Sequence, residues 1–122
     1  LVFTLSSMTK IILDTNFIMA CAKQKIDFLE ELMFMGLKPI IPDKVLNELK
    51  RLKNNNAETA LKVLHSGGFE KIELKGKYAD SAIVAYLKKN KDVAIATLDK
   101  DLAEKISNKR VIIRGKKKLE MV

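Results

Sequence analysis

Short apolar runs alternate along this chain with segments whose apolar residues recur every three or four positions. The short runs predict buried strands, and recurrence at i, i+3, i+4 and i+7 predicts amphipathic helices. The expected strands span residues 11–14, 38–41, 69–74, 93–96 and 110–113. The expected helices span residues 27–36, 43–53, 57–66, 78–90 and 99–108. Such alternation predicts an α/β fold in which helices cover both faces of a parallel sheet.

The length of 122 residues suits one compact domain, which we expect to span residues 10–115. A basic C-terminal tail is expected at residues 116–122. Met8 is the expected natural start, which makes residues 1–7 a remnant from outside the natural protein. The N-terminal segment 1–9 is expected to be disordered or to derive from such a remnant. No apolar run approaches the roughly 20 residues that span a bilayer. A single cysteine, Cys21, forms no internal disulfide and fits a cytoplasmic location.

Four acidic residues lie at or beside the apolar positions of these elements: Asp14, Glu48, Asp80 and Asp99. The helical periodicity turns the last three inward, and Glu48, in mid-helix, is expected to be partly buried. Two carboxylates ~4 Å apart repel by roughly 4 kcal/mol at an effective dielectric of ~20. Because all-oxygen ligand sets favour hard cations, these acids indicate a shared site for Mg²⁺ or Mn²⁺.

The expected positions of the acids support one location. Asp14 and Asp99 lie at or just past the carboxyl ends of two strands, where open parallel sheets place their sites. The acids near helix starts could instead act as caps, and Glu48 could pair with a lysine. Asp101 has Lys105 four residues later, so it is expected to form a solvent-facing ion pair and is left out of the site.

The chain is basic, with 23 Lys and Arg against 15 Asp and Glu and a formal net charge of +8. This excess favours a polyanionic partner, with nucleic acid the first candidate and an anionic membrane surface the second. A cluster at Lys88-Lys89 and Lys91 ends one helix, where lysines also complement the helix dipole. The residues expected to contact a nucleic-acid backbone are Lys50, Arg51, Lys53, Arg114, Lys116, Lys117 and Lys118.

Several other chemistries lack the residues that they need. His65 is the only histidine and Cys21 the only cysteine, which excludes a Cys/His zinc site and leaves a Ser-His-Asp arrangement without a nucleophile elbow. No glycine-rich phosphate motif is present. The acids and the lysines together indicate phosphodiester hydrolysis, in which metal ions activate water and neutralise the phosphate.

The sequences around the four acids resemble the motifs of PIN-domain ribonucleases. The opening and the basic end are most similar to small archaeal members, which are themselves similar to the nuclease that processes small-subunit ribosomal RNA and to VapC-type toxins. The resemblance runs from about residue 10 to 114. The matching segments are Ile11–Asn16, Val45–Leu49, Ala79–Ile83 and Ala96–Leu102. Ser81 stands where many relatives carry a second acid, so a second metal is expected to bind weakly.

The resemblance implies a three-layer α/β/α sandwich with a parallel sheet of about five strands. It implies an endoribonuclease that uses one or two Mg²⁺ or Mn²⁺ ions, held by the four acids that also catalyse. Thr15, Asn16 and Thr97 are then expected to support the site by hydrogen bonding. The implied partners are RNA, a second copy of the chain, and either an antitoxin protein or a pre-ribosomal particle, but no membrane.

Two other functions are weighed against this one. A non-catalytic RNA-binding or ribosome-assembly module would keep the acids only for folding, and it would bind RNA in a salt-sensitive way without cleaving it. A phosphorylation receiver would need an acidic pair near the first strand, whereas Glu48 and Asp80 are expected within helices. The sequence leaves open whether a ribonuclease of this kind is a toxin or a processing enzyme.

Overall fold

The computed structural model describes residues 8–122. The expectations for residues 1–7 therefore lie outside the described residues. Thr9, which was expected within a disordered start, is the first residue of a strand.

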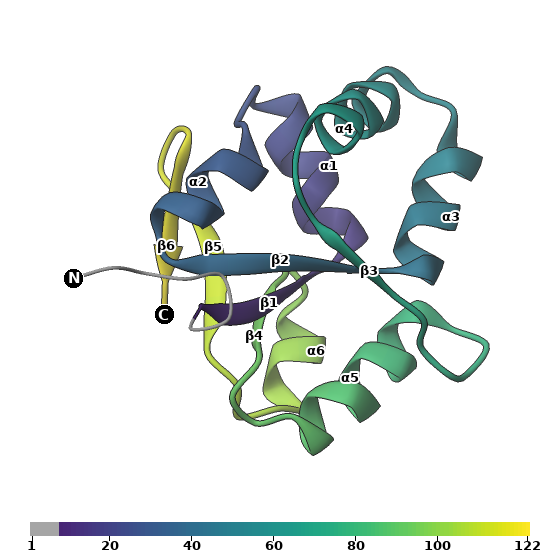
Figure 1. Cartoon of the computed structure of the whole chain (residues 1–122), viewed down its shortest axis with the longest axis vertical. Helices are drawn as coiled ribbons and strands as arrows, with labels where there is room; N and C mark the ends of the chain where they lie inside the picture. The colour runs from purple at the N-terminus through teal and green to yellow at the C-terminus, as the bar shows by residue number, and fades with distance from the viewer. Residues whose placement is uncertain (1–7) are drawn as a thin grey trace.

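The described part of the chain has at its centre a six-stranded sheet with the order β3-β2-β1-β4-β5-β6 (Figure 1). The strands are β1 (Thr9–Leu13), β2 (Leu37–Pro42), β3 (Glu70–Ile72), β4 (Ala94–Ala96), β5 (Arg110–Arg114) and β6 (Lys118–Met121). The first five are parallel, and β6 runs antiparallel to β5. The predicted α/β fold with a parallel sheet of about five strands is confirmed, with one added edge strand.

The added strand lies in the segment 116–122, where the sequence indicated only a basic tail. Gly115 and Lys117 both have positive φ, 61° and 59°, and they turn the chain back on itself. Arg114 then pairs with Lys118, and Leu119 packs into the core. The lysines of the expected tail therefore lie in and beside a hairpin turn.

In residues 8–122, six helices cover the two faces of the sheet. They are α1 (Thr15–Lys23), α2 (Phe28–Phe34), α3 (Asp43–Leu52), α4 (Asn55–Ser66), α5 (Ala79–Lys89) and α6 (Lys100–Glu104). Figure 1 shows α1 to α4 on one side of the sheet, and α5 and α6 on the other. The range of α1 was not delimited by the apolar pattern, and α6 is shorter than the expected helix 99–108. Among the described residues, no helix combines the length and the apolar character that a membrane crossing requires.

The topology fixes where a site can form. The chain builds the sheet outward from β1 to β2 and β3, then returns to place β4 and β5 on the opposite side of β1. The connecting helices therefore leave β1 and β4 toward opposite faces. Ligands in open α/β sheets bind in the crevice at such a switch point, beyond the carboxyl ends of the strands. The strand residues Ile11, Ile12 and Leu13 and their neighbour Ile95 are fully buried, so the crevice rests on a rigid core.

Candidate active site at the carboxyl edge of the sheet

Asp14 lies at the end of β1 and caps the N-terminus of α1. Its side chain is buried, with 4% of the residue exposed. Oδ1 accepts a hydrogen bond from the backbone N–H of Thr15 at 2.9 Å, and Oδ2 accepts one from the hydroxyl of Thr97 at 2.8 Å. The apolar run of β1 thus ends in a carboxylate that the protein holds in a fixed orientation.

The pKa of Asp14 is raised above its ordinary value of 3.8. Burial is the largest cause, because it removes the charged form from water. The hydrogen bonds from Thr97 and Thr15 act in the opposite direction, and the charges of Asp80 and Asp99 raise the pKa further. Three of the four predicted acids, Asp14, Asp80 and Asp99, therefore lie close enough together for the charges of the other two to affect Asp14.

The side chains of Asn16 and Thr97 link the residues that follow β1 to the residues that follow β4. The Asn16 side-chain oxygen accepts a hydrogen bond from the N–H of Leu98 at 3.2 Å. Thr97, which is fully buried, donates to Asp14 and accepts from the N–H of Asp99 at 3.1 Å. These bonds hold the segment of Asp14 and the segment of Asp99 together at the point where the strand order reverses.

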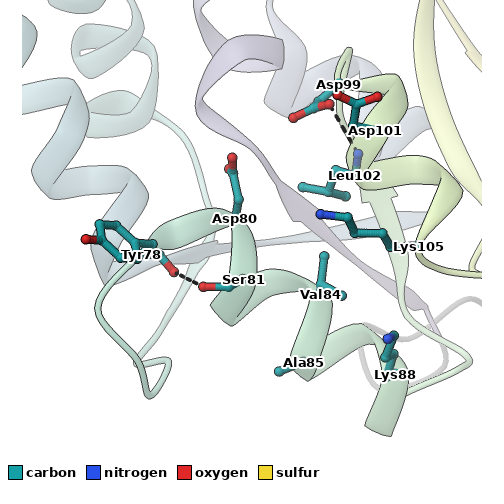
Figure 2. A pocket seen from close by; sticks show the side chains of 10 residues that line it. All are labelled: Tyr78, Asp80, Ser81, Val84, Ala85, Lys88, Asp99, Asp101, Leu102 and Lys105. Carbon is teal, nitrogen blue, oxygen red and sulfur yellow. Dashed lines mark hydrogen bonds between the residues drawn. The ribbon is translucent and has the colours of Figure 1, made fainter.

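Asp99 and Asp80 lie at the starts of α6 and α5, the two helices below the sheet in Figure 1. Asp99 caps α6, since its Oδ1 accepts from the N–H of Leu102 at 3.2 Å, and Asp80 lies exposed in the first turn of α5. Both line a cleft between these helices (Figure 2). The residues that line it are Tyr78, Asp80, Ser81, Val84, Ala85, Lys88, Asp99, Asp101, Leu102 and Lys105.

Asp101 differs from its expected role. It lines this cleft together with Asp80 and Asp99. In residues 8–122 the ion pairs are Lys38–Glu70 and Arg114–Glu120, so the expected pair of Asp101 with Lys105 is wrong. Lys105 instead extends its amine toward the space between α5 and α6 (Figure 2).

Glu48 was expected to be partly buried, and this is also wrong. The buried face of α3 is formed by Val45 and Leu49. At 100° per residue, Glu48 lies roughly 80° from the centre of that face, which leaves its carboxylate exposed. It does not line the cleft between α5 and α6.

Comparison with known proteins agrees with this geometry. A family profile described as "PIN like domain" matches residues 11–116. The chain belongs to the PIN-like domain family. The predicted resemblance to PIN-domain proteins is thereby confirmed.

This PIN-like domain is similar to proteins named for ribonuclease activity and for ribosomal RNA processing. It is 30% identical over 127 residues to Ribonuclease VapC4 of Methanocaldococcus jannaschii, a match that covers 93% of this chain and 97% of that protein. It is 39% identical over 101 residues to the rRNA-processing protein fcf1 of Schizosaccharomyces pombe, over 79% of this chain. The match spans only about half (52%) of the length of fcf1.

A solved structure extends the likeness to three dimensions. The PIN domain endonuclease Utp24 superimposes with a TM-score of 0.82 at 32% sequence identity, over 97% of this chain and 94% of that chain. The order of elements around the acids is therefore that of a PIN domain.

The oxygen donors of this PIN-like domain suit a hard cation. Each Asp14 carboxylate oxygen accepts one hydrogen bond and keeps a further lone pair, while Asp99 uses one oxygen as a cap. The Thr15 hydroxyl is buried and has no hydrogen-bond partner. Within residues 8–122, however, no group of three Asp, Glu, His or Cys side chains is arranged to hold a metal ion.

The basic residues predicted from the sequence lie away from the cleft. Lys50, Arg51 and Lys53 are exposed at the end of α3, and Lys116 to Lys118 are exposed at the β5–β6 hairpin. Figure 1 places these two clusters on opposite sides of the molecule. Arg114 is bonded to Glu120, with Nε and Oε2 2.7 Å apart. The two lysines that do line the cleft, Lys88 and Lys105, were not among the predicted contacts.

Proposed function

We propose that this PIN-like domain is an endoribonuclease that hydrolyses RNA phosphodiester bonds with the help of Mg²⁺ or Mn²⁺. The observation that carries the proposal is the buried carboxylate of Asp14, whose pKa is raised by burial and by Asp80 and Asp99. A desolvated carboxylate beside two other acids is tolerated best when a cation neutralises it. The names of the relatives, a ribonuclease and an endonuclease, support the same reaction class.

Each acid has a proposed role. Asp14 and Asp99 would hold the principal ion, and Asp80 would bridge or assist. Glu48, which is exposed on α3, would orient the second ion or the attacking water. One or two bound ions would neutralise the scissile phosphate and lower the pKa of the water that attacks it. Ser81 in place of a second acid makes the second ion the weaker one.

The neighbouring residues position these acids. Thr97 fixes the Asp14 carboxylate and the backbone of Asp99, and Asn16 ties the β1 loop to the β4 loop. Thr15 contributes its backbone N–H to Asp14 and a buried hydroxyl beside it. The basic residues at the end of α3 and in the hairpin are proposed to attract the RNA backbone from farther away.

Two biological roles fit this chemistry, ribosomal RNA processing and a toxin–antitoxin system, both in the cytoplasm. The partners would be RNA, a second copy of the chain, and either a pre-ribosomal particle or an antitoxin protein. A neighbouring reading frame that encodes a small DNA-binding antitoxin would favour the toxin, whereas binding to a pre-ribosomal particle would favour processing.

The test is cleavage of end-labelled RNA in Mn²⁺ by the wild type and by Asp14→Asn. Asn keeps the capping geometry of position 14 and removes its charge. The expected result is cutting by the wild type and a loss of cutting by the variant. Glu58→Gln, an exposed acid on α4, is the matched control and should cut like the wild type. Equal cutting by all three proteins would reject the assignment of Asp14.

A second candidate function is a non-catalytic RNA-binding module. It is favoured by one specific observation, which is that Asp14 and Asp99 each cap a helix and so have a structural use. This function requires RNA binding that weakens with salt and no metal-dependent cleavage by the wild type. The same cleavage assay therefore separates the two functions.

A further inference from the structure

The cleft between α5 and α6 has two chemically different ends. Figure 2 shows the carboxylates of Asp80, Asp99 and Asp101 at one end, and Lys105 and Lys88 following along the two helices. Between the helices the side chains of Val84 and Leu102 are apolar. A ligand in this cleft would meet acids, then an apolar floor, then two positive charges.

Both lysines are available to bind an anion. They are exposed, and neither takes part in the ion pairs found in residues 8–122. Lys105 extends its amine toward the space between the helices in Figure 2. Lys88 lies two turns after Asp80 on the same face of α5, because residues at i, i+4 and i+8 share a helix face. The lysines thus continue the line that begins at the acids.

An exposed aromatic ring stands at the acidic end. Tyr78 is 67% exposed, and it is one of two aromatic residues in the described part of the chain with a large exposed ring, the other being Phe34. Lys77 Nζ lies 5.7 Å from the centre of the Tyr78 ring. The backbone carbonyl of Tyr78 accepts hydrogen bonds from Ser81 Oγ at 3.3 Å and from Ala82 N at 3.1 Å, which fix the position of the ring's attachment.

We propose that, when RNA lies in this cleft, Tyr78 stacks on a base beside the acids and Lys88 and Lys105 bind phosphates on their other side. The assignment rests on the proposed function of the acids. Aromatic platforms next to basic grooves are the means by which proteins bind unpaired strands, because every base has a face that can stack. In an A-form duplex those faces are covered by neighbouring bases. The cleft should therefore favour an unpaired strand over a duplex.

Binding is measured by fluorescence anisotropy with a short labelled RNA in EDTA, so that metal-dependent cleavage cannot interfere. Tyr78→Ala should weaken binding of the single strand roughly 5- to 100-fold, the range found when a stacking aromatic is removed. Tyr78→Phe keeps the ring and should bind like the wild type. Phe34→Ala removes the other exposed aromatic, on α2, and should leave the affinity within about twofold.

The lysines are tested through the salt dependence of the same binding. Lys88→Ala/Lys105→Ala should reduce the slope of log K against log salt by about 1.4, since each phosphate contact on a single strand contributes about 0.7. Lys62→Ala/Lys71→Ala removes two exposed charges outside the cleft and is the matched control. An equal change of slope in both double variants would overturn the assignment of Lys88 and Lys105.

Cleavage kinetics in Mn²⁺ complete the test. The Tyr78 and lysine variants should raise KM and leave kcat within about twofold of the wild type, because they bind RNA and leave the acids in place. Unchanged KM, a loss confined to kcat, an effect of Tyr78→Phe as large as that of Tyr78→Ala, or the same loss on duplex RNA would each overturn the proposal. A wild type that binds RNA but does not cleave it would contradict the proposed function. The anisotropy measurements alone would then test the assignments of Tyr78, Lys88 and Lys105.

Discussion

Asp14 and Glu70 lie in the same sheet, at the end of β1 and the start of β3, yet their surroundings shift their pKa values in opposite directions. Lys38 Nζ lies 3.0 Å from Glu70 Oε2, and this bond lowers the pKa of a carboxyl that remains partly exposed. The pKa of Asp14 is raised, because burial outweighs its two hydrogen bonds and two acids lie nearby.

The comparison distinguishes Glu70, whose ionised form is favoured in the folded protein, from Asp14, whose ionised form is disfavoured there. Glu70 has its countercharge within the protein, so ionisation and folding favour one another. The ionised form of Asp14 has no cation among the described residues, since the two ion pairs there involve other acids. Groups whose pKa values are shifted by burial and by like charges are concentrated at functional sites. We infer that a cation from solution completes the site of Asp14.

The largest expected effect concerns Asp99, the second acid that caps a helix. Asn is about as good a cap as Asp, so Asp99→Asn removes the charge and keeps α6 intact. We expect RNA cleavage to fall at least about a hundredfold, since even the outer partners of metal ligands are worth 10–100-fold. Glu70→Gln should cut like the wild type. Full activity in Asp99→Asn with an unchanged Tm would show that this acid serves only as a cap.

Thr97 is the next test, because its buried hydroxyl orients Asp14 and accepts the N–H of Asp99. Thr97→Val keeps the shape and removes both bonds. Cleavage should fall by about 10- to 100-fold, and stability by about 1–3 kcal/mol for the buried polar groups left without partners. Thr59→Val, at an exposed position on α4, is the control in both assays. A loss of stability with full activity would limit Thr97 to a structural role.

The strands and the crevice could be predicted because their signals are local. Ile11–Leu13 and 93–96 are continuous apolar runs, as expected for parallel strands buried on both faces. Asp14 follows the first run directly, and Asp99 lies three residues after the end of the second. The positions of Asp14 and Asp99 at one edge then follow from the parallel topology. Nothing beyond the order of the elements was needed for that inference.

The errors arose where tertiary packing decides. Strand β6 was not predicted because Leu119 has charged residues on both sides and forms no apolar run. The segment becomes an edge strand only through its pairing with β5. The pair of Asp101 with Lys105 was inferred from their spacing alone, and spacing does not determine that Lys105 reaches into the cleft. Tyr78 could have been noticed only as an aromatic residue two positions before Asp80, since the other wall of its cleft comes from α6, which lies far along the chain.

Metal-free stability against pH provides a smaller test. The folded pKa of Asp14 lies above 3.8, so the folded state binds a proton more tightly and stability falls as the pH rises through the raised pKa. Asp14→Asn should therefore have a higher Tm than the wild type at pH 7 in EDTA. That advantage should shrink as the pH falls through the raised pKa and disappear below 3.8, where Asp14 is protonated in both states. A variant that is less stable at pH 7 would show that the hydrogen bonds of the carboxylate outweigh its desolvation.

Glu70 should show the opposite sign and the smallest effect. Its folded pKa is lowered below 4.5, so the stability it contributes is present above pH 4.5 and is lost as the pH falls through the lowered value. Because the pair is partly exposed to solvent, Glu70→Gln should cost less than about 1 kcal/mol at pH 7. Thermal melts across the acidic range measure this loss, and a stabilising effect at pH 7 would reverse the comparison with Asp14.

Thermal unfolding at pH 7 with increasing Mn²⁺ tests most directly whether a cation completes the acidic crevice. The Tm of the wild type should rise with the ion, by the equivalent of about 2.7 kcal/mol when the free ion reaches a hundred times its Kd. Asp14→Asn, with the higher Tm in EDTA, should gain little. A wild-type Tm that ignores Mn²⁺, or an equal rise in both proteins, would contradict the account.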